Sequence, residues 1–173
     1  MRIALVGFMG CGKTSIGGIL ASRLGLPFVD LDGEIEASSG ATIAEIFNLH
    51  GEPGFRVIEE RCLAALAGRQ GPFVLACGGG VVLSPANRDV LVKDFAAVWI
   101  DVPFAELMKR LAGEREQRPL LKSDDYEDRA KKLFLARKQL YETTAQFTVR
   151  WEQGESPEAS AAKIIEMLEI ARQ

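Results

Sequence analysis

One short stretch near the start of the sequence limits the fold more than any other feature. Residues 7–14 read Gly-Phe-Met-Gly-Cys-Gly-Lys-Thr and match the pattern G-x-x-x-x-G-K-[S/T] at every fixed position. An apolar run at residues 3–6 precedes this stretch, and a helical pattern at residues 13–24 follows it. Because glycine is only about 7% of average composition, a chance match in such a chain has odds on the order of one in a hundred. The motif therefore predicts a phosphate-binding loop between a strand and a helix.

Such a loop binds nucleotide phosphates mainly through its backbone. Glycines let N–H groups converge on phosphate oxygens, and the start of the next helix adds the positive end of its dipole. We expect the Lys13 ammonium to reach the β- and γ-phosphates and the Thr14 hydroxyl to ligate Mg²⁺. The residues expected to contact the nucleotide phosphates are Gly10, Cys11, Gly12, Lys13, Thr14 and Ser15.

Short apolar runs alternate with longer helical patterns along the whole chain. The apolar runs are residues 3–6, 27–30, 72–76, 95–100 and 146–149. The helical patterns are residues 13–24, 43–49, 57–66, 85–92, 104–111, 124–141 and 157–170. Continuous apolar runs are typical of parallel strands that are covered on both faces. The alternation predicts an α/β fold with three layers, α/β/α, and we expect one domain over residues 1–173.

Composition excludes several classes of protein. The formal net charge is −3, whereas nucleic-acid-binding proteins usually carry a basic surplus. No apolar run approaches the roughly 20 residues of a membrane span, and the first run is too short for the core of a signal peptide. The three cysteines, Cys11, Cys62 and Cys77, form no CxxC pair or zinc pattern. We expect a cytoplasmic, monomeric enzyme that binds neither nucleic acid nor membrane.

Two carboxylates end the second predicted strand. Asp30 and Asp32 are two residues apart, so on a strand both would point the same way, toward the edge where α/β sheets bind ligands. One could hold Mg²⁺, directly or through water, and the other could draw a proton from an acceptor hydroxyl. The alternative is that Asp32 caps a helix while Asp30 is solvated. Residues 30–33 also satisfy the D-x-x-G of GTPases, but no N-K-x-D guanine motif follows.

Further motifs follow in order along the chain. Gly-Glu-Pro-Gly-Phe-Arg-Val-Ile-Glu-Glu at residues 51–60 places Arg56 and Glu59 one helical turn apart, either as a surface pair or as part of a site. Three successive glycines at residues 78–80 suit a close approach of backbone to a ligand. Arg118-Pro-Leu-Leu lies in the polar stretch 113–125, and Arg137-Lys-Gln-Leu-Tyr ends a helix. Taken singly, these basic residues could equally be a solvated helix face.

All of these motifs together, behind a phosphate loop, resemble the shikimate kinase family. The resemblance runs from residue 5 to about residue 141. It implies a P-loop fold with a five-stranded parallel sheet in the order 2-3-1-4-5. It also implies transfer of the γ-phosphoryl of ATP to the 3-hydroxyl of shikimate, with Mg²⁺, in aromatic amino-acid biosynthesis. Residues near 31–60 would bind the acceptor, and residues near 112–124 would form a lid.

The resemblance also implies a role for each matching residue. Asp30 corresponds to the metal-side carboxylate, and Asp32 to the carboxylate that binds shikimate hydroxyls and acts as base. Arg56 and Arg137 correspond to the two arginines that clamp the shikimate carboxylate, each with a planar fork of donors. Glu59 corresponds to a residue that supports this pocket.

The glycines and two further arginines complete the implied site. Gly78, Gly79 and Gly80 correspond to substrate-side glycines, with Gly79 offering its N–H to the acceptor. Arg118 corresponds to the lid arginine that reaches the phosphates, which makes it catalytic together with Lys13 and Asp32. Arg110 is expected to stack on adenine. The chain departs from the family at residues 153–157, where the arginine that often precedes the proline of the adenine loop is missing.

Two other functions fit part of this pattern. Another small-metabolite kinase, such as a gluconate kinase, would share the phosphate loop but would not need both Arg56 and Arg137. A regulator that binds nucleotide without turnover would lack an intact acceptor clamp, and this chain has one.

Overall fold

The predicted strands form one parallel sheet. A computed structural model of the chain describes residues 1–112 and 125–171. The strands lie in the order β2-β3-β1-β4-β5, which confirms the expected topology, and all four neighbouring pairs are parallel. The strands are β1 Ile3–Val6, β2 Phe28–Asp30, β3 Val74–Ala76, β4 Ala96–Asp101 and β5 Phe147–Arg150.

The central strand is buried along its whole length. Every residue of β1 has a relative exposure of 0%, and Leu5 lies in register with Ala76 of β3 on one side and Val98 of β4 on the other. The edge strands keep exposed positions, such as Phe28 of β2 and Arg150 of β5. An unbroken apolar sequence is what a strand covered on both faces requires, so β1 fixes the centre of the fold.

Most helices begin and end close to the predicted residues. The α-helices of the described part are α1 Lys13–Leu24, α2 Leu31–Ser39, α3 Ile43–Gly68, α4 Pro85–Asp94, α5 Phe104–Ala112, α6 Tyr126–Thr144 and α7 Pro157–Ile170. The Ser84 hydroxyl accepts from the Asn87 N–H and caps α4, with Pro85 in the first turn. Ser156 and Pro157 repeat this arrangement at the start of α7.

The region between β2 and β3 departs from the prediction. Helix α2 was not predicted. The two helices expected at residues 43–49 and 57–66 are both present, and they join across a kink within α3. Within α3, Gly51 takes a non-helical conformation with φ 65° and ψ −177°. The helix resumes directly because Pro53 falls in the first turn after this kink, where a missing N–H costs no hydrogen bond.

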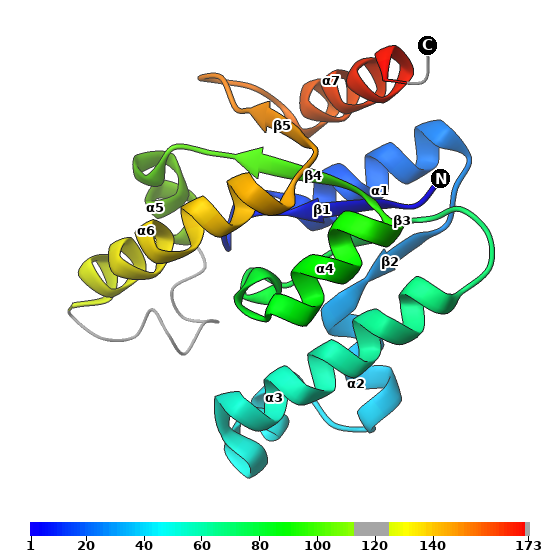
Figure 1. Ribbon diagram of the computed structural model, residues 1–173. Helices are drawn as coiled ribbons and strands as arrows, with labels where there is room; N and C mark the ends of the chain where they lie inside the picture. The colour runs from blue at the N-terminus through cyan, green and yellow to red at the C-terminus, as the bar shows by residue number, and fades with distance from the viewer. Residues whose placement is uncertain (113–124, 172–173) are drawn as a thin grey trace.

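The sheet lies between two layers of helices (Figure 1). Helices α1 and α7 pack together on one face, and α4, α6 and the C-terminal part of α3 lie over the other. Because all strands are parallel, the loops that follow β1, β2 and β3 emerge at one edge, where ligands bind in this class of fold. Within the described residues, no helix combines the length and apolar character needed to cross a membrane.

Candidate active site

The phosphate loop leads from β1 directly into the first turn of α1. Gly12 is the N-cap of α1, with φ 95° and no side-chain capping bond. The N–H groups of the next three residues, Lys13, Thr14 and Ser15, have no carbonyl one turn earlier within the helix and point out of its N-terminus. A side chain at Gly10 would also meet Leu111 of α5 at 3.1 Å. The loop therefore presents bare backbone donors to an anion.

Lys13 folds back over this loop. Its Nζ donates to the carbonyl oxygens of Gly7 at 2.9 Å and Phe8 at 3.0 Å, and it lies 3.5 Å from the Cys11 Sγ. The carbonyls hold the ammonium beside the place where phosphates would sit, so a phosphate can attract it without a large movement. Cys11 is buried with its thiol turned toward Gly7, so it can serve a phosphate only through its backbone.

Asp30 joins the phosphate loop to the second strand. The Thr14 hydroxyl donates to Asp30 Oδ2 at 3.0 Å, and the Asp32 N–H donates to Asp30 Oδ1 at 3.1 Å. Asp30 is thus the N-cap of α2. The prediction that both carboxylates project from one strand is wrong, because this cap ends β2 at Asp30 and puts Asp32 in the first turn of α2. The alternative cap assignment, to Asp32, is wrong for the same reason.

Both aspartates nevertheless line one cavity. Its volume is about 250 Å³, and its walls come from the phosphate loop, the end of β2 and the segment after β3. Partial burial and the charge of Asp30 raise the pKa of Asp32, while Lys13 and Arg56 oppose the shift. The lining residues are Met9, Gly10, Gly12, Lys13, Thr14, Ser15, Asp30, Asp32, Cys77, Gly78 and Gly79.

The hydroxyl of Thr14 and the carboxylate of Asp30 are suited to Mg²⁺. Mg²⁺ prefers oxygen ligands and is commonly held by one or two protein groups, with waters and substrate phosphates completing the set. Among the described residues there is no cluster of three His, Cys, Asp or Glu side chains that would form an all-protein metal site. The donor set therefore fits a metal ion that arrives with a nucleotide.

Each glycine of the segment after β3 faces a different neighbour. A Cβ on Gly78 would stand 2.9 Å from Asp32 Oδ1 and 3.3 Å from Glu59 Oε1. A Cβ on Gly80 would stand 2.2 Å from Arg56 Nη2, because the guanidinium lies directly against the backbone there. Real Cβ atoms do not approach other atoms this closely, so the absence of side chains lets the polar groups of α2 and α3 reach the segment.

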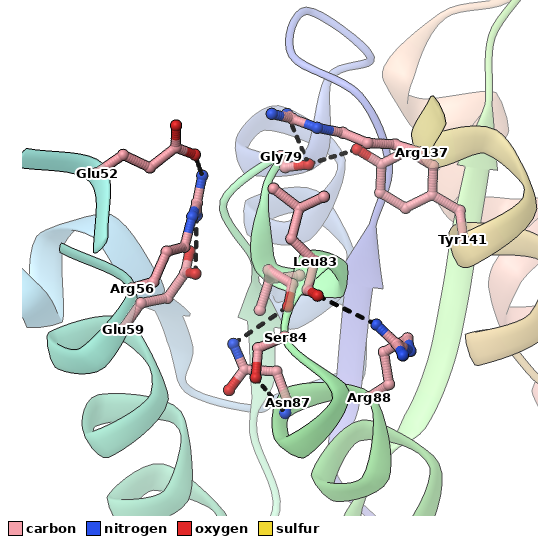
Figure 2. Close-up of polar contacts among 11 residues, drawn as sticks. Glu52, Arg56, Glu59, Gly79, Leu83, Ser84, Asn87, Arg88, Arg137 and Tyr141 are labelled. Carbon is pink, nitrogen blue, oxygen red and sulfur yellow. Dashed lines mark hydrogen bonds and ion pairs between the residues drawn. The ribbon is translucent and has the colours of Figure 1, made fainter. Parts of the chain in front are cut away.

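Arg56 lies between two carboxylates of its own helix (Figure 2). Its Nη1 donates to Glu59 Oε2 at 2.8 Å and its Nη2 to Glu52 Oε1 at 2.9 Å. Glu59 is 1% exposed, so the Arg56–Glu59 contact is not a solvated surface pair. Burial raises the pKa of Glu59, Arg56 opposes the shift and the charge of Asp32 adds to it. Glu59 Oε1 and Arg56 Nε have no hydrogen-bond partner among the described residues.

Arg137 approaches the same segment from α6. Its side chain is buried, its Nη1 donates to the Gly79 carbonyl at 3.2 Å, and its Nε has no partner in the described part of the chain. Figure 2 shows Arg56 on one side of the glycine segment and Arg137 on the other. Two guanidiniums with unused donors, 81 positions apart in sequence (137 − 56), thus meet beside the cavity that also holds the phosphate loop. This arrangement suits a small acceptor that carries a carboxylate.

Comparison with known proteins matches this geometry to one family. The family model described as shikimate kinase matches residues 9–169. The chain belongs to the shikimate kinase family.

Relatives in the shikimate kinase family align over nearly the whole chain. A shikimate kinase of Halorhodospira halophila is 42% identical, over 97% of this chain and 93% of the relative. One of a Synechococcus species is 45% identical, over 96% and 85%. A solved structure of the Acinetobacter baumannii shikimate kinase in complex with shikimate has a TM-score of 0.89 at 38% identity, covering 96% of this chain and 92% of that one. The enzyme from Aquifex aeolicus gives 0.83 at 34%, covering 98% and 96%.

Arg110 lies at the outer side of the phosphate loop. Its Nε donates to Glu106 at 2.9 Å, its Nη1 lies 3.5 Å from the Gly10 carbonyl, and its guanidinium stands over the Trp151 ring at 5.1 Å. The Trp151 Nε1–H donates to the Glu155 carbonyl at 3.1 Å and steadies the loop after β5. The predicted adenine contact of Arg110 is not tested by these contacts, and Arg118 lies outside the described residues.

Sequence reasoning missed two residues of this shikimate kinase site. Glu52 falls in the motif at residues 51–60, and it is the exposed partner of Arg56. Tyr141 ends the motif that begins at Arg137, and its hydroxyl donates to the Gly79 carbonyl at 2.5 Å. The four-residue spacing of Arg137 and Tyr141 was the available signal, because it places both on one face of a helix.

Proposed function

We propose that this chain transfers the γ-phosphoryl of ATP to the 3-hydroxyl of shikimate, giving ADP and shikimate 3-phosphate, as a step of aromatic amino-acid biosynthesis. The observation that carries the proposal is the pair Arg56 and Arg137, which face the glycine segment beside the phosphate loop. A phosphate loop alone serves many acceptors, whereas one buried and one half-buried guanidinium with unused donors specify a carboxylate. The complex of the Acinetobacter baumannii enzyme with shikimate supports the same assignment.

Each part of the phosphate side has a role in this reaction. The backbone N–H groups at the start of α1 bind the β-phosphate, and Lys13 moves from its loop carbonyls onto the β- and γ-phosphates. Thr14 and Asp30 would hold Mg²⁺, which neutralises charge on the phosphate oxygens when it is bound. The chain thus holds the transferring group in line with the acceptor, and positioning with electrostatic stabilisation supplies most of the catalysis.

The acceptor is oriented by its carboxylate and activated at its hydroxyl. Arg56 and Arg137 take the carboxylate, and Asp32 accepts a hydrogen bond from the hydroxyl that is phosphorylated. A raised pKa makes Asp32 a stronger base than a free aspartate, which suits a group that receives this proton. Glu59 keeps Arg56 in place through a buried contact, and the N–H groups of residues 78–80 bind the other polar atoms of the acceptor.

The remaining sequence predictions belong to this proposal as well. Arg118 acts on the transferring phosphoryl from a lid near residues 112–124, and Arg110 stacks on the adenine. The protein works as a monomeric single domain in the cytoplasm and binds neither nucleic acid nor membrane. Its net charge of −3 and its three free thiols, Cys11, Cys62 and Cys77, support a small-molecule enzyme of a reducing compartment.

An assay that couples ADP release to a panel of hydroxy acids tests the proposal. We expect turnover only when ATP, Mg²⁺ and shikimate are present together. A preference for gluconate would make the protein another small-metabolite kinase. ATP hydrolysis at the same rate without shikimate, or nucleotide binding without any turnover, would also overturn the assignment.

A further inference from the structure

The Gly79 carbonyl accepts hydrogen bonds from two side chains of the same helix. Arg137 Nη1 donates to it at 3.2 Å, and the Tyr141 hydroxyl donates to it at 2.5 Å. Residues four apart lie one above the other on one face of a helix, so α6 presents both donors to one oxygen (Figure 2). The proposed function uses Arg137 and leaves Tyr141 without a role.

The two donors have different tasks once an acceptor binds. A carboxylate that Arg137 clamps carries a full charge and competes with the neutral Gly79 carbonyl for the guanidinium N–H groups. Arg137 already has one unpartnered donor, its Nε, among the described residues. Arg137 is therefore free to turn to a ligand, and the carbonyl keeps a partner only through Tyr141.

The Gly79 peptide lies inside a turn that the Val81 N–H closes on the Gly78 carbonyl at 3.1 Å, but this turn leaves the Gly79 carbonyl to the donors of α6. Three successive glycines have no side chains to hold their conformation, and the N–H groups of Gly79 and Gly80 donate to no other described residue. A Cβ on Gly79 would stand 3.3 Å from the Met9 backbone nitrogen, so this peptide also lies against the phosphate loop. Because the peptide unit is planar, a bond to the Gly79 carbonyl also orients the Gly80 N–H.

The Tyr141 side chain is itself fixed in place, so its hydroxyl can hold the Gly79 carbonyl. Its relative exposure is 0%, and its ring stacks on Trp99 of β4 with 6.2 Å between centroids. Burial raises the pKa of its hydroxyl, although Arg137 opposes the shift, so the group remains a donor throughout the physiological range.

We infer that Tyr141 is a positioning residue for the acceptor: it holds the Gly79 carbonyl so that Arg137 can leave this oxygen and bind the acceptor carboxylate. The inference rests on the proposed function, because it takes the ligand of Arg137 to be a carboxylate. Tyr141 touches neither substrate in this scheme. Its hydroxyl acts through the glycine peptide and through Arg137.

The test compares Tyr141→Phe with the wild type, both alone and in an Arg137→Met background. The phenyl ring keeps the contact with Trp99, so thermal unfolding should show a folded protein. Titration calorimetry should give a shikimate Kd about tenfold higher for Tyr141→Phe, the loss of one hydrogen bond to a partly buried group. The Kd for ATP should stay unchanged. In the Arg137→Met background, Tyr141→Phe should change the shikimate Kd by less than about twofold, because no guanidinium remains to be released.

A matched control removes another buried hydroxyl from the same helix. The Thr144 hydroxyl donates to the Leu140 carbonyl within α6 and does not contact the glycine segment, so Thr144→Val should leave the shikimate Kd unchanged. Equal losses for Tyr141→Phe in both backgrounds, or an equal loss of ATP affinity, would show a merely structural role and overturn the inference.

A measurement on the wild-type protein keeps the inference testable even if the variant folds poorly. The carbonyl ¹³C shift of Gly79 should stay in the hydrogen-bonded range when shikimate is added, and a shift to the unbonded range would overturn the inference. If the wild type binds no shikimate in calorimetry, the proposed function itself fails, and this outcome is distinct from a bound acceptor with an unaffected Tyr141→Phe variant.

Discussion

The phosphate loop and the acceptor pocket lie side by side, but they are built differently. The loop uses backbone groups from consecutive residues, positioned by Gly12 at the start of α1. The pocket uses side chains from three separate helices, α2, α3 and α6, which meet at the glycine segment after β3. Glu59 and Arg137 are buried there, and polar atoms of Arg56, Glu59 and Arg137 lack partners among the described residues.

This difference has consequences for what each side can bind. Backbone donors are fixed by the fold and suit a phosphate, which is common to many nucleotides. Buried charges with unused hydrogen-bonding capacity are costly unless a ligand satisfies them, so they select for one ligand. We therefore expect changes on the phosphate side to lower turnover with any acceptor, and changes on the acceptor side to lower affinity for shikimate alone.

The largest effect should come from Lys13→Met on the phosphate side. Losing a cation that stabilises the transferring phosphoryl should lower kcat by about a hundredfold or more, while circular dichroism shows a folded protein. Lys93→Met is the control, because Lys93 is exposed at the end of α4, next to the start of β4 and away from the phosphate loop. A variant that keeps more than about a tenth of wild-type kcat, less than ~1.4 kcal/mol of effect, contradicts the role of Lys13.

The second effect tests the acceptor side directly. Arg56→Ala and Arg137→Ala should each weaken shikimate binding by about 1.5–3 kcal/mol, the loss of a charge-assisted bidentate contact, and leave ATP binding nearly unchanged. Calorimetric titration with each ligand separates the two. Arg61→Ala is the control, because Arg61 lies on the same helix as Arg56 but is exposed. If ATP affinity falls as much as shikimate affinity, the two arginines do not belong to the acceptor pocket.

The same contrast explains what the sequence could predict. The phosphate loop is local, so residues 7–14 and their flanking patterns were enough to predict its strand, its turn and its helix. The topology of the sheet and the pairing of Arg56 with Arg137 came from the resemblance to a family, because no local pattern relates residues so far apart. The side-chain orientation at Asp32 was predicted wrongly, since a strand period was continued past a residue that caps a helix.

Contacts between distant segments were beyond sequence reasoning. The bond from Tyr141 to Gly79 joins residues 62 positions apart and depends on how α6 packs against the sheet. The burial of Glu59 likewise depends on how α3 packs against α2 and the glycine segment, and its spacing from Arg56 fits a surface pair equally well. The roles of Arg110 and Arg118 stay predictions.

A smaller effect is expected where the pocket meets the glycine segment. Gly80→Ala places a Cβ 2.2 Å from Arg56 Nη2, so the guanidinium must move although the fold need not. We expect shikimate affinity to fall about tenfold, as for one displaced hydrogen-bonding group, with ATP affinity preserved. Gly18→Ala in α1 is the matched control, because nothing lies within 4 Å of its added Cβ. A shikimate Kd like that of the wild type would show that Arg56 does not need its position against Gly80.

The smallest effect should come from a change at Glu52, the exposed one of the two carboxylate partners of Arg56. Glu52 is 57% exposed whereas Glu59 is 1% exposed, and an exposed ion pair contributes only about 0–1 kcal/mol. Glu52→Gln should therefore leave the unfolding temperature nearly unchanged. It should also tighten shikimate binding slightly, by up to about twofold, because the acceptor carboxylate no longer competes with Glu52 for Arg56.

The matched change at the buried partner, Glu59, should change shikimate affinity in the opposite direction. Glu59→Gln removes the buried charge that keeps the Arg56 guanidinium in the pocket, so shikimate binding should weaken. Added salt should shrink the difference between Glu52→Gln and the wild type, since exposed charges are screened, and should affect Glu59→Gln less. Titrations at two salt concentrations measure both. If Glu52→Gln weakens shikimate binding as much as Arg56→Ala does, Glu52 orients Arg56 instead of competing for it, and the exposed carboxylate belongs to the working site as much as the buried one does.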